Sequence, residues 1–385
     1  MNKCIVSIFF LVLTSCTSNQ YFRTHITDIP CELNDATACD TANLEINKHD
    51  DYTLGFIEIA DNGQFHDERQ VSSLIKLLQN ESKPQYVTIY VHGWHHNASE
   101  NDRDTKAFKD NLKETKLRNP NFKIIGIYVG WQGETISLPF LRWLTFWDRK
   151  SVSYEIGQDA LLRFFLQTES IVKAKSDNKL LTIGHSLGGS VVFNALQSVF
   201  LERLTQIPKE KMVGFGDLVV LVNPAFEAIR FASFREFSQK YSEKNVVNQN
   251  PLLIIASSES DTMIKDDFPM ATAFGAVFDL HRFLSSPLDF FSAWDLDTIA
   301  VGHFSPYITH RLETNNYSLS TNYSCPSNNI LLNDSQSKMQ LHHLKNSTTL
   351  NPYWVMQIDK KIMPNHGFMK QKDFWCFLDL TLKGL

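Results

Sequence analysis

Hydrophobic residues along the chain form short unbroken runs that alternate with longer amphipathic stretches. Unbroken apolar runs are typical of strands buried on both faces of a sheet. They occur at 86–91, 124–130, 180–183, 218–222, 252–256 and 353–358. Between them we expect helices at 67–79, 100–116, 152–175, 191–196, 226–241 and 373–383. This alternation predicts an α/β fold with a mostly parallel sheet that helices cover on both faces.

Two parts of the chain depart from this rhythm. Tyr52 to Ala60 alternates apolar and polar residues, which predicts an edge strand. From about 263 to 350, the first half is rich in phenylalanine. The second half is rich in asparagine and serine, so we expect loops in that half. We therefore predict one domain over 51–385, with a long insertion at about 263–350 before its last strand.

The first residues resemble a targeting segment. Lys3 precedes an apolar run, Ile5 to Leu13, that is too short to cross a membrane. The run ends Leu13-Thr14-Ser15-Cys16, which resembles a bacterial lipobox; an ordinary secretory signal is the alternative. The resemblance implies a signal peptide at 1–15 and a lipid on Cys16. We then expect a tether at 16–50 and export to a membrane surface, with Thr17, rather than Asp, favouring the outer membrane.

Composition and charge exclude several classes of partner. The chain is 43% hydrophobic and 21% charged, and its formal net charge is −5. Its basic residues are scattered, so we expect no nucleic-acid partner. No zinc-type spacing, P-loop or dinucleotide-binding fingerprint occurs, so we expect no metal and no organic cofactor.

Export makes disulfides possible. With Cys4 removed and Cys16 lipidated, the remaining cysteines are Cys31, Cys39, Cys325 and Cys376. Cys31 and Cys39 are close enough to close a small loop, and Cys325 with Cys376 would then tie down the late segment. Four cysteines allow three pairings, and the sequence leaves these open.

The most informative stretch is Gly184-His185-Ser186-Leu187-Gly188, which lies between an apolar strand and an apolar helix. It fits the G-x-S-x-G nucleophile elbow, in which a sharp turn projects the serine hydroxyl above the sheet. Small residues are needed at 184 and 188 because the backbone approaches itself there. The positive end of the following helix favours a developing oxyanion. Ser186 is therefore the candidate nucleophile, against an idle serine on a glycine-rich turn.

An oxyanion hole needs two N–H donors beside the nucleophile. We assign one to the backbone of Leu187 and the other to Trp94, in the His92-Gly93-Trp94 turn that follows the 86–91 strand. His92, His95 and His96 could also suggest a metal site, but no cysteine or carboxylate accompanies them at ligand spacing.

The acid and base are chosen by chain order and position. Asp261 follows the 252–256 strand and is the candidate acid, with Glu259 as its competitor. His366 lies between the 353–358 strand and the closing helix, and is the candidate base. His303, within the insertion, is the alternative base.

Together, the elbow, the His92 turn and the order Ser186, Asp261, His366 resemble the α/β-hydrolase superfamily. The continuation His95-His96-Asn97-Ala98 and the segment Thr145-Phe146-Trp147-Asp148-Arg149-Lys150 resemble a narrower set of bacterial hydrolases. The resemblance implies hydrolysis of an ester, a thioester or an amide, and does not identify the substrate. We expect a serine hydrolase that cleaves a small acyl ester through a Ser-His-Asp triad and an acyl-enzyme. An acyltransferase and a catalytically silent, membrane-anchored binding module remain alternatives.

Two apolar segments are candidates for an acyl groove. They are 138–147 and the phenylalanine-rich first half of the insertion. Ordinary core packing explains both segments equally well.

Overall fold

The computed structural model describes most of the chain in eight ranges. These are 21–34, 39–133, 142–205, 211–245, 249–276, 290–314, 339–344 and 350–384. Expectations that fall on other residues lie outside the described part, among them the signal peptide, Cys16 and Cys325.

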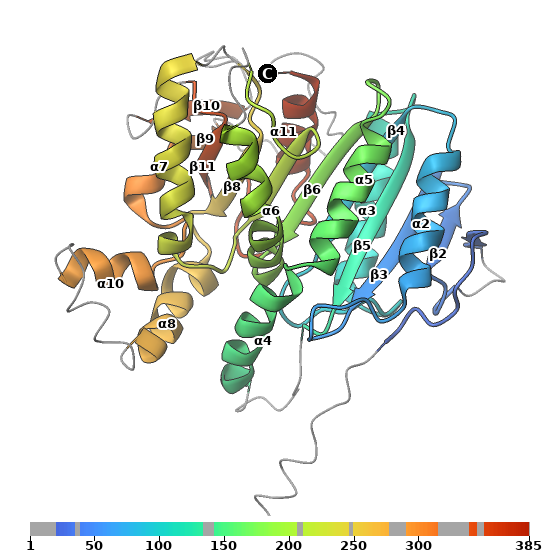
Figure 1. The fold of residues 1–385 in the computed structure, drawn as a ribbon, viewed down its shortest axis with the longest axis horizontal. Helices are drawn as coiled ribbons and strands as arrows, with labels where there is room; N and C mark the ends of the chain where they lie inside the picture. Colours follow the sequence, from blue (N-terminus) through green and yellow to red (C-terminus); the bar gives the residue numbers. More distant parts are fainter. Residues whose placement is uncertain are drawn as a thin grey trace, which may run out of the picture.

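One large sheet organises the described ranges (Figure 1). Its eleven strands lie in the order β1-β2-β3-β5-β4-β6-β7-β8-β11-β9-β10. They are β1 (Cys31–Glu32), β2 (Leu44–Asn47), β3 (Tyr52–Ile59), β4 (Gln85–Val91), β5 (Lys123–Trp131), β6 (Lys179–His185), β7 (Leu218–Val222), β8 (Leu253–Ser258), β9 (His310–Thr314), β10 (Met339–His343) and β11 (Tyr353–Ile358). Every neighbouring pair from β3 to β9 is parallel, and β2 and β10 run antiparallel to their neighbours β3 and β9. The prediction of an α/β protein with a mostly parallel sheet is confirmed, and the arrangement is consistent with an α/β-hydrolase fold.

Helices cover both faces of the sheet. The helices are α2 (Glu68–Asn80), α3 (Arg103–Arg118), α4 (Arg142–Ile156), α5 (Ala160–Val172), α6 (Leu187–Thr205), α7 (Ala228–Asn245), α8 (Phe268–Ala276), α10 (Phe290–Thr298) and α11 (Lys372–Lys383). One core lies under α2, α4, α5, α6 and α7, and the other lies under α3 and α11. Successive residues of β3 serve opposite cores, since Phe56 belongs to the second and Ile57 to the first.

The expectation of an edge strand at Tyr52–Ala60 is wrong. β3 lies inside the sheet between β2 and β5, and all its residues are buried. Its polar positions suggested solvent, yet Glu58 accepts hydrogen bonds from the backbone N–H groups of Phe22 (3.0 Å) and Arg23 (2.7 Å). The alternation therefore reflects a buried polar group with partners from the N-terminal segment.

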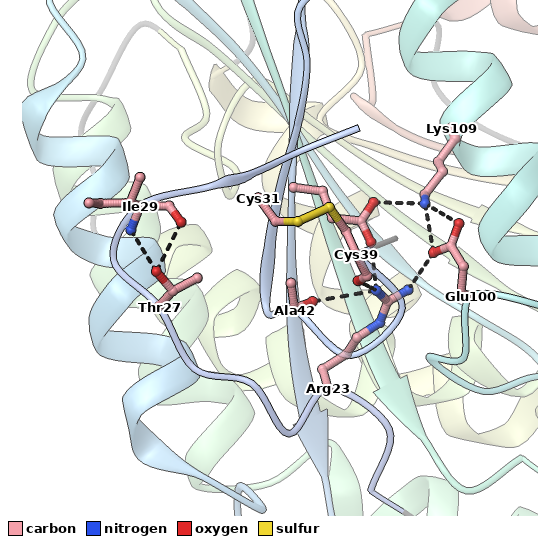
Figure 2. The surroundings of a disulfide bond; sticks show 9 residues. Arg23, Thr27, Ile29, Cys31, Cys39, Ala42, Glu100 and Lys109 are labelled. Atoms are coloured by element: carbon pink, nitrogen blue, oxygen red, sulfur yellow. Dashed lines mark hydrogen bonds and ion pairs between the residues drawn. A yellow bond between two sulfur atoms is a disulfide. The ribbon is translucent and has the colours of Figure 1, made fainter. Parts of the chain in front are cut away.

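The described residues of the N-terminal segment, 21–34 and 39–50, are folded, so the expected tether at 16–50 is wrong for these residues. Figure 2 shows the fully buried Arg23 guanidinium among backbone carbonyls and carboxylates. It donates to the carbonyl of Ala98 (2.7 Å) and pairs with Glu45 (2.5 Å) and Glu100 (3.1 Å). These partners allow a polar segment to pack against the sheet without an apolar periodicity.

The single helix expected at 152–175 is two helices, α4 and α5. The break lies at Gly157, where a Cβ would stand 2.6 Å from the Val191 carbonyl of α6. Asp159 then adopts a positive φ of 41°. Close approach to α6 therefore divides a stretch whose apolar spacing is continuous.

The insertion contains more regular structure than expected. Its first part forms η1 (Met263–Asp267), a π-helical turn, followed by α8, α10 and η3 (Ser305–Tyr307), a short 3-10 turn. In its second part, β9 and β10 pair antiparallel at the sheet edge, where loops were expected. The alternating burial of β9 and β10 is the pattern of strands with one covered face, which the surrounding Asn- and Ser-rich sequence obscures.

Cys31 and Cys39 form a disulfide, and Cys376 is also disulfide-bonded. Among the described residues, no helix is long and apolar enough to cross a bilayer.

Candidate active site

Ser186 lies on a sharp turn between β6 and α6. Its φ is +56°, in the left-handed region that non-glycine residues rarely adopt. The turn is held by hydrogen bonds from Ser186 N–H to the Val222 carbonyl (3.0 Å) and from Ala225 N–H to the Ser186 carbonyl (3.0 Å). A strained serine at this position is the local geometry expected of a nucleophile elbow.

Close backbone approach explains the glycines around Ser186. A Cβ on Gly188 would stand 2.2 Å from the Val91 carbonyl oxygen, and one on Gly184 would stand 2.5 Å from the Gly188 oxygen. A Cβ on Gly93 would stand 2.9 Å from the Ser186 Cβ. The turn after β4 therefore passes directly against the serine, which places Trp94 in the region assigned to an oxyanion hole.

The structure brings Asp261 and His366 together. Asp261 is fully buried just beyond β8, and its Oδ2 accepts a hydrogen bond from His366 Nδ1 at 2.7 Å. Its Oδ1 accepts from the backbone N–H of Ile264 (3.3 Å). With Nδ1 donating to the carboxylate, the other ring nitrogen of His366, Nε2, is the proton acceptor.

Two side chains hold the backbone of His366, and we call them the carbonyl clamp. His185 Nε2–H and Asn223 Nδ2–H both donate to the His366 carbonyl oxygen, at 2.9 Å and 2.8 Å. Asn223, at a φ of +45°, also accepts from the backbone N–H of Ser258 (2.8 Å). The clamp therefore links the elbow strand, the end of β7 and the end of β8 to the loop that carries His366.

Burial keeps His185 neutral. Burial, with a smaller contribution from the nearby His366, lowers the pKa of His185 to about 3. The two rings lie 4.7 Å apart between centroids. A neutral His185 donates one hydrogen bond without placing a positive charge beside His366. Sequence reasoning missed both clamp residues, although His185 lies inside the elbow motif and Asn223 directly follows β7.

The competing acid and base occupy other environments. Glu259 pairs with Arg311 at 2.9 Å. His303 is largely buried, and burial lowers the pKa of its imidazole. Its Nε2 has no hydrogen-bond partner, whereas His366 is bonded to Asp261.

The histidines of the 92–96 turn have structural partners. His92 Nδ1 bonds the Gly93 carbonyl (2.8 Å), its Nε2 accepts from Trp131 N–H (3.1 Å), and burial lowers its pKa to about 4. Burial opposes a charge on His96, but a hydrogen bond to Asp102 (3.0 Å) raises its pKa overall. Within the described ranges, no cluster of three or more His, Cys, Asp or Glu residues is arranged to hold a metal.

A pocket opens beside Ser186 and has mostly apolar walls. Its lining residues are Trp94, Phe146, Ser186, Ala225, Met263, Ile264, Asp267, Phe268 and Ala271. Phe146 packs edge-on against Trp94 (ring centroids 5.5 Å apart) and against Phe268 (6.2 Å). Both segments named as acyl-groove candidates thus contribute a phenylalanine, while 138–141 and 277–289 lie outside the described residues.

Buried charge lies behind this aromatic wall. Lys150 is ion-paired with Glu227, and its ammonium group lies 4.9 Å from the centroid of the Phe268 ring. Arg149, the preceding residue, pairs with Asp61 at 2.9 Å. The polar end of the 145–150 segment therefore fixes α4 against the loops after β3 and β7.

Comparisons with known proteins give little further information. No family model matches the sequence, and no curated protein matches it. Among solved structures, a protein described as a YdeN-like hydrolase from Pectobacterium atrosepticum aligns at 16% identity over 52% of this chain and 76% of its own. The TM-score is 0.18, an overlap too small to place this chain in a family.

Proposed function

We propose that this protein is a serine hydrolase that cleaves carboxylic esters through an acyl-enzyme. The observation that carries the proposal is the 2.7 Å hydrogen bond between Asp261 and His366. It lies at the carboxyl ends of the parallel strands, where Ser186 lies on a strained turn. A buried carboxylate that orients an imidazole is the arrangement of acid and base in a Ser-His-Asp triad.

In the proposed reaction, His366 Nε2 takes the proton of the Ser186 hydroxyl as its oxygen attacks the ester carbonyl. Asp261 holds the imidazole in the required tautomer and stabilises its positive charge. The backbone N–H groups of Trp94 and Leu187 donate to the oxyanion. His366 then gives its proton to the leaving alcohol. In the second half of the reaction, water attacks the acyl-enzyme, His366 takes a proton from the water and returns it to Ser186, and the acid product leaves.

The test combines covalent labelling with turnover. We expect a fluorophosphonate probe to label the wild-type protein and not the Ser186→Ala variant. We expect His366→Ala to lower kcat for p-nitrophenyl acetate by at least about a thousandfold, because it removes the base. His303→Ala is the matched control and should retain activity.

Each alternative predicts a different result. Folded wild-type protein that is neither labelled nor active would indicate a silent binding module and overturn the proposal. An inactive His303→Ala with an active His366→Ala would overturn the assignment of the base. Transfer of the acyl group to an added alcohol in preference to water would instead identify an acyltransferase.

A further inference from the structure

The N-terminal segment joins the fold near the carboxyl ends of the parallel strands, where Ser186 also lies. We call this side of the molecule the carboxyl edge of the sheet. Arg23 and Phe22 bind Glu58, near the carboxyl end of β3. The strands β3, β5, β4 and β6 are all parallel. Glu58 lies opposite Gly130 on β5, while Val91 on β4 lies opposite both Val129 on β5 and Gly184 on β6. Glu58 is therefore level with His185, the residue before the candidate nucleophile.

The distance along this edge is short. Three strand spacings of about 4.8 Å separate β3 from β6, which is roughly 14 Å. Tyr21, the first described residue, follows Cys16 by five positions. Five residues span at most about 18 Å when fully extended. A lipid on Cys16 would therefore reach the carboxyl edge of the sheet, but not the opposite edge, which is about 30 Å away along the nine residues of β5.

The attachment of this segment is firm. Arg23 is fully buried, and its Nε donates to the Ala98 carbonyl in the loop after β4. Lys109 and Glu100 complete the ion cluster around it. An anchor near Tyr21 would thus hold this end of the sheet, and not the opposite end, close to a membrane.

Apolar side chains lie exposed at the same edge. The turn η1 and helix α8 follow β8 and line the pocket beside Ser186; Figure 1 shows α8 at the end toward which the parallel strands point. Met263 and Met270, on these two elements, are 42% and 65% exposed. Met263 also lines the pocket, and flexible apolar side chains close to an apolar pocket suit contact with acyl chains.

We propose that the carboxyl edge of the sheet rests on a lipid bilayer, with Met263 and Met270 in contact with it, so that the Ser186 pocket takes an acyl ester of a membrane lipid. This rests on the proposed hydrolase function and on lipidation at Cys16. The two residues supply contact area, and the short N-terminal connection supplies the orientation.

The first test measures the orientation of the protein on a bilayer and does not depend on enzymatic activity. Full-length lipidated protein is reconstituted into vesicles that contain brominated phospholipid, as Met270→Trp and as Leu117→Trp. Leu117 is equally exposed (67%) but lies near the end of α3, at the opposite edge. We expect the bromine atoms to quench the tryptophan added at 270 and not the one added at 117. Equal quenching, or an absence of lipid on Cys16, would overturn the proposal.

The second test compares turnover of a lipid ester with turnover of a soluble ester. Met270→Glu and a 24-residue Gly/Ser insertion between Asn19 and Gln20 should each lower turnover of a fluorogenic ester lipid in vesicles at least tenfold. Turnover of soluble p-nitrophenyl acetate should stay unchanged, as should both activities of Leu117→Glu. Unchanged lipid turnover in both variants would overturn the proposal. Quenching at 270 with no turnover of either ester would instead refute the hydrolase function and leave the orientation intact.

Discussion

At the residue scale, the carbonyl clamp is the feature that connects the candidate triad to the sheet. His185 belongs to the elbow strand, and Asn223 bonds Ser258 at the end of the strand before Asp261. Both donate to the same carbonyl oxygen of His366. The position of the imidazole is therefore set by the two strands that carry its proposed partners.

This predicts that His185 is a positioning residue for His366. His185→Phe keeps the ring and removes the donor, so we expect kcat for a soluble ester to fall about 10- to 100-fold with KM unchanged, because small misplacements of a catalytic group are costly. His185→Gln retains an N–H donor and should recover most of the loss. Steady-state kinetics on both variants measure this split. A folded His185→Phe with wild-type kcat would contradict the role.

The sequence was informative for Ser186 because a strained turn demands glycines at fixed spacing. Asp261 and His366 followed from chain order, and the structure joins them by a hydrogen bond. The clamp was not foreseen, because its bonds end on a backbone carbonyl far along the chain, and no local pattern marks such an acceptor.

At the element scale, the central parallel strands and most helices were predictable, because unbroken apolar runs indicate burial. Strands β1, β2, β9 and β10 were not predicted, since their sequences are short or polar. The N-terminal segment was not, because its packing depends on ion pairs such as Arg23 with Glu45, which join residues 22 positions apart. Burial raises the pKa of the Glu45 carboxyl, while Lys109 and Arg23 oppose that rise. Charged residues normally indicate exposure to solvent, so the sequence alone predicts a tether here.

Arg23 should therefore be essential for the N-terminal segment. Arg23→Met leaves Glu45 and Glu100 with Lys109 alone, and we expect a loss of about 3 kcal/mol in the free energy of unfolding, as for other broken buried ion pairs. Urea denaturation measures it. Lys76→Met, which breaks the exposed pair with Asp28, is the matched control and should change little. Equal effects of the two substitutions would show that burial of Arg23 adds no stability.

At the scale of the whole molecule, buried neutral histidines give the fold an acid-sensitive stability. Burial lowers the pKa of His310 to about 3, with a smaller effect from His343, and its ring stacks on Trp354 at 4.1 Å. His92 and His185 are lowered in the same way. Unfolding exposes all three rings to water, where their pKa returns to about 6.5.

Because the folded pKa of His310 is depressed, the unfolded state binds more protons between about pH 3 and pH 6.5. Stability then falls as pH drops below 6.5, by about 1.4 kcal/mol per pH unit for one such histidine. Buried Glu58 has a raised pKa and acts in the opposite direction, so the comparison must be made between variants. We expect His310→Phe to lose less stability than wild type between pH 7 and pH 5 in urea denaturation. Identical pH slopes would refute the contribution of His310.

Strands β8 and β11 pair over their full length, and this pairing sets where the chain segments that carry Asp261 and His366 begin. These strands are adjacent and parallel from Leu253 opposite Tyr353 to Ser258 opposite Ile358, although about a hundred residues separate them in the chain. Asp261 follows one strand and His366 follows the other. The chain between them thus leaves the sheet at the end of β8 and returns to it beside β8, at β11. A change in the length of this intervening chain would leave the spacing of Asp261 and His366 unchanged, because the pairing of β8 with β11 sets it.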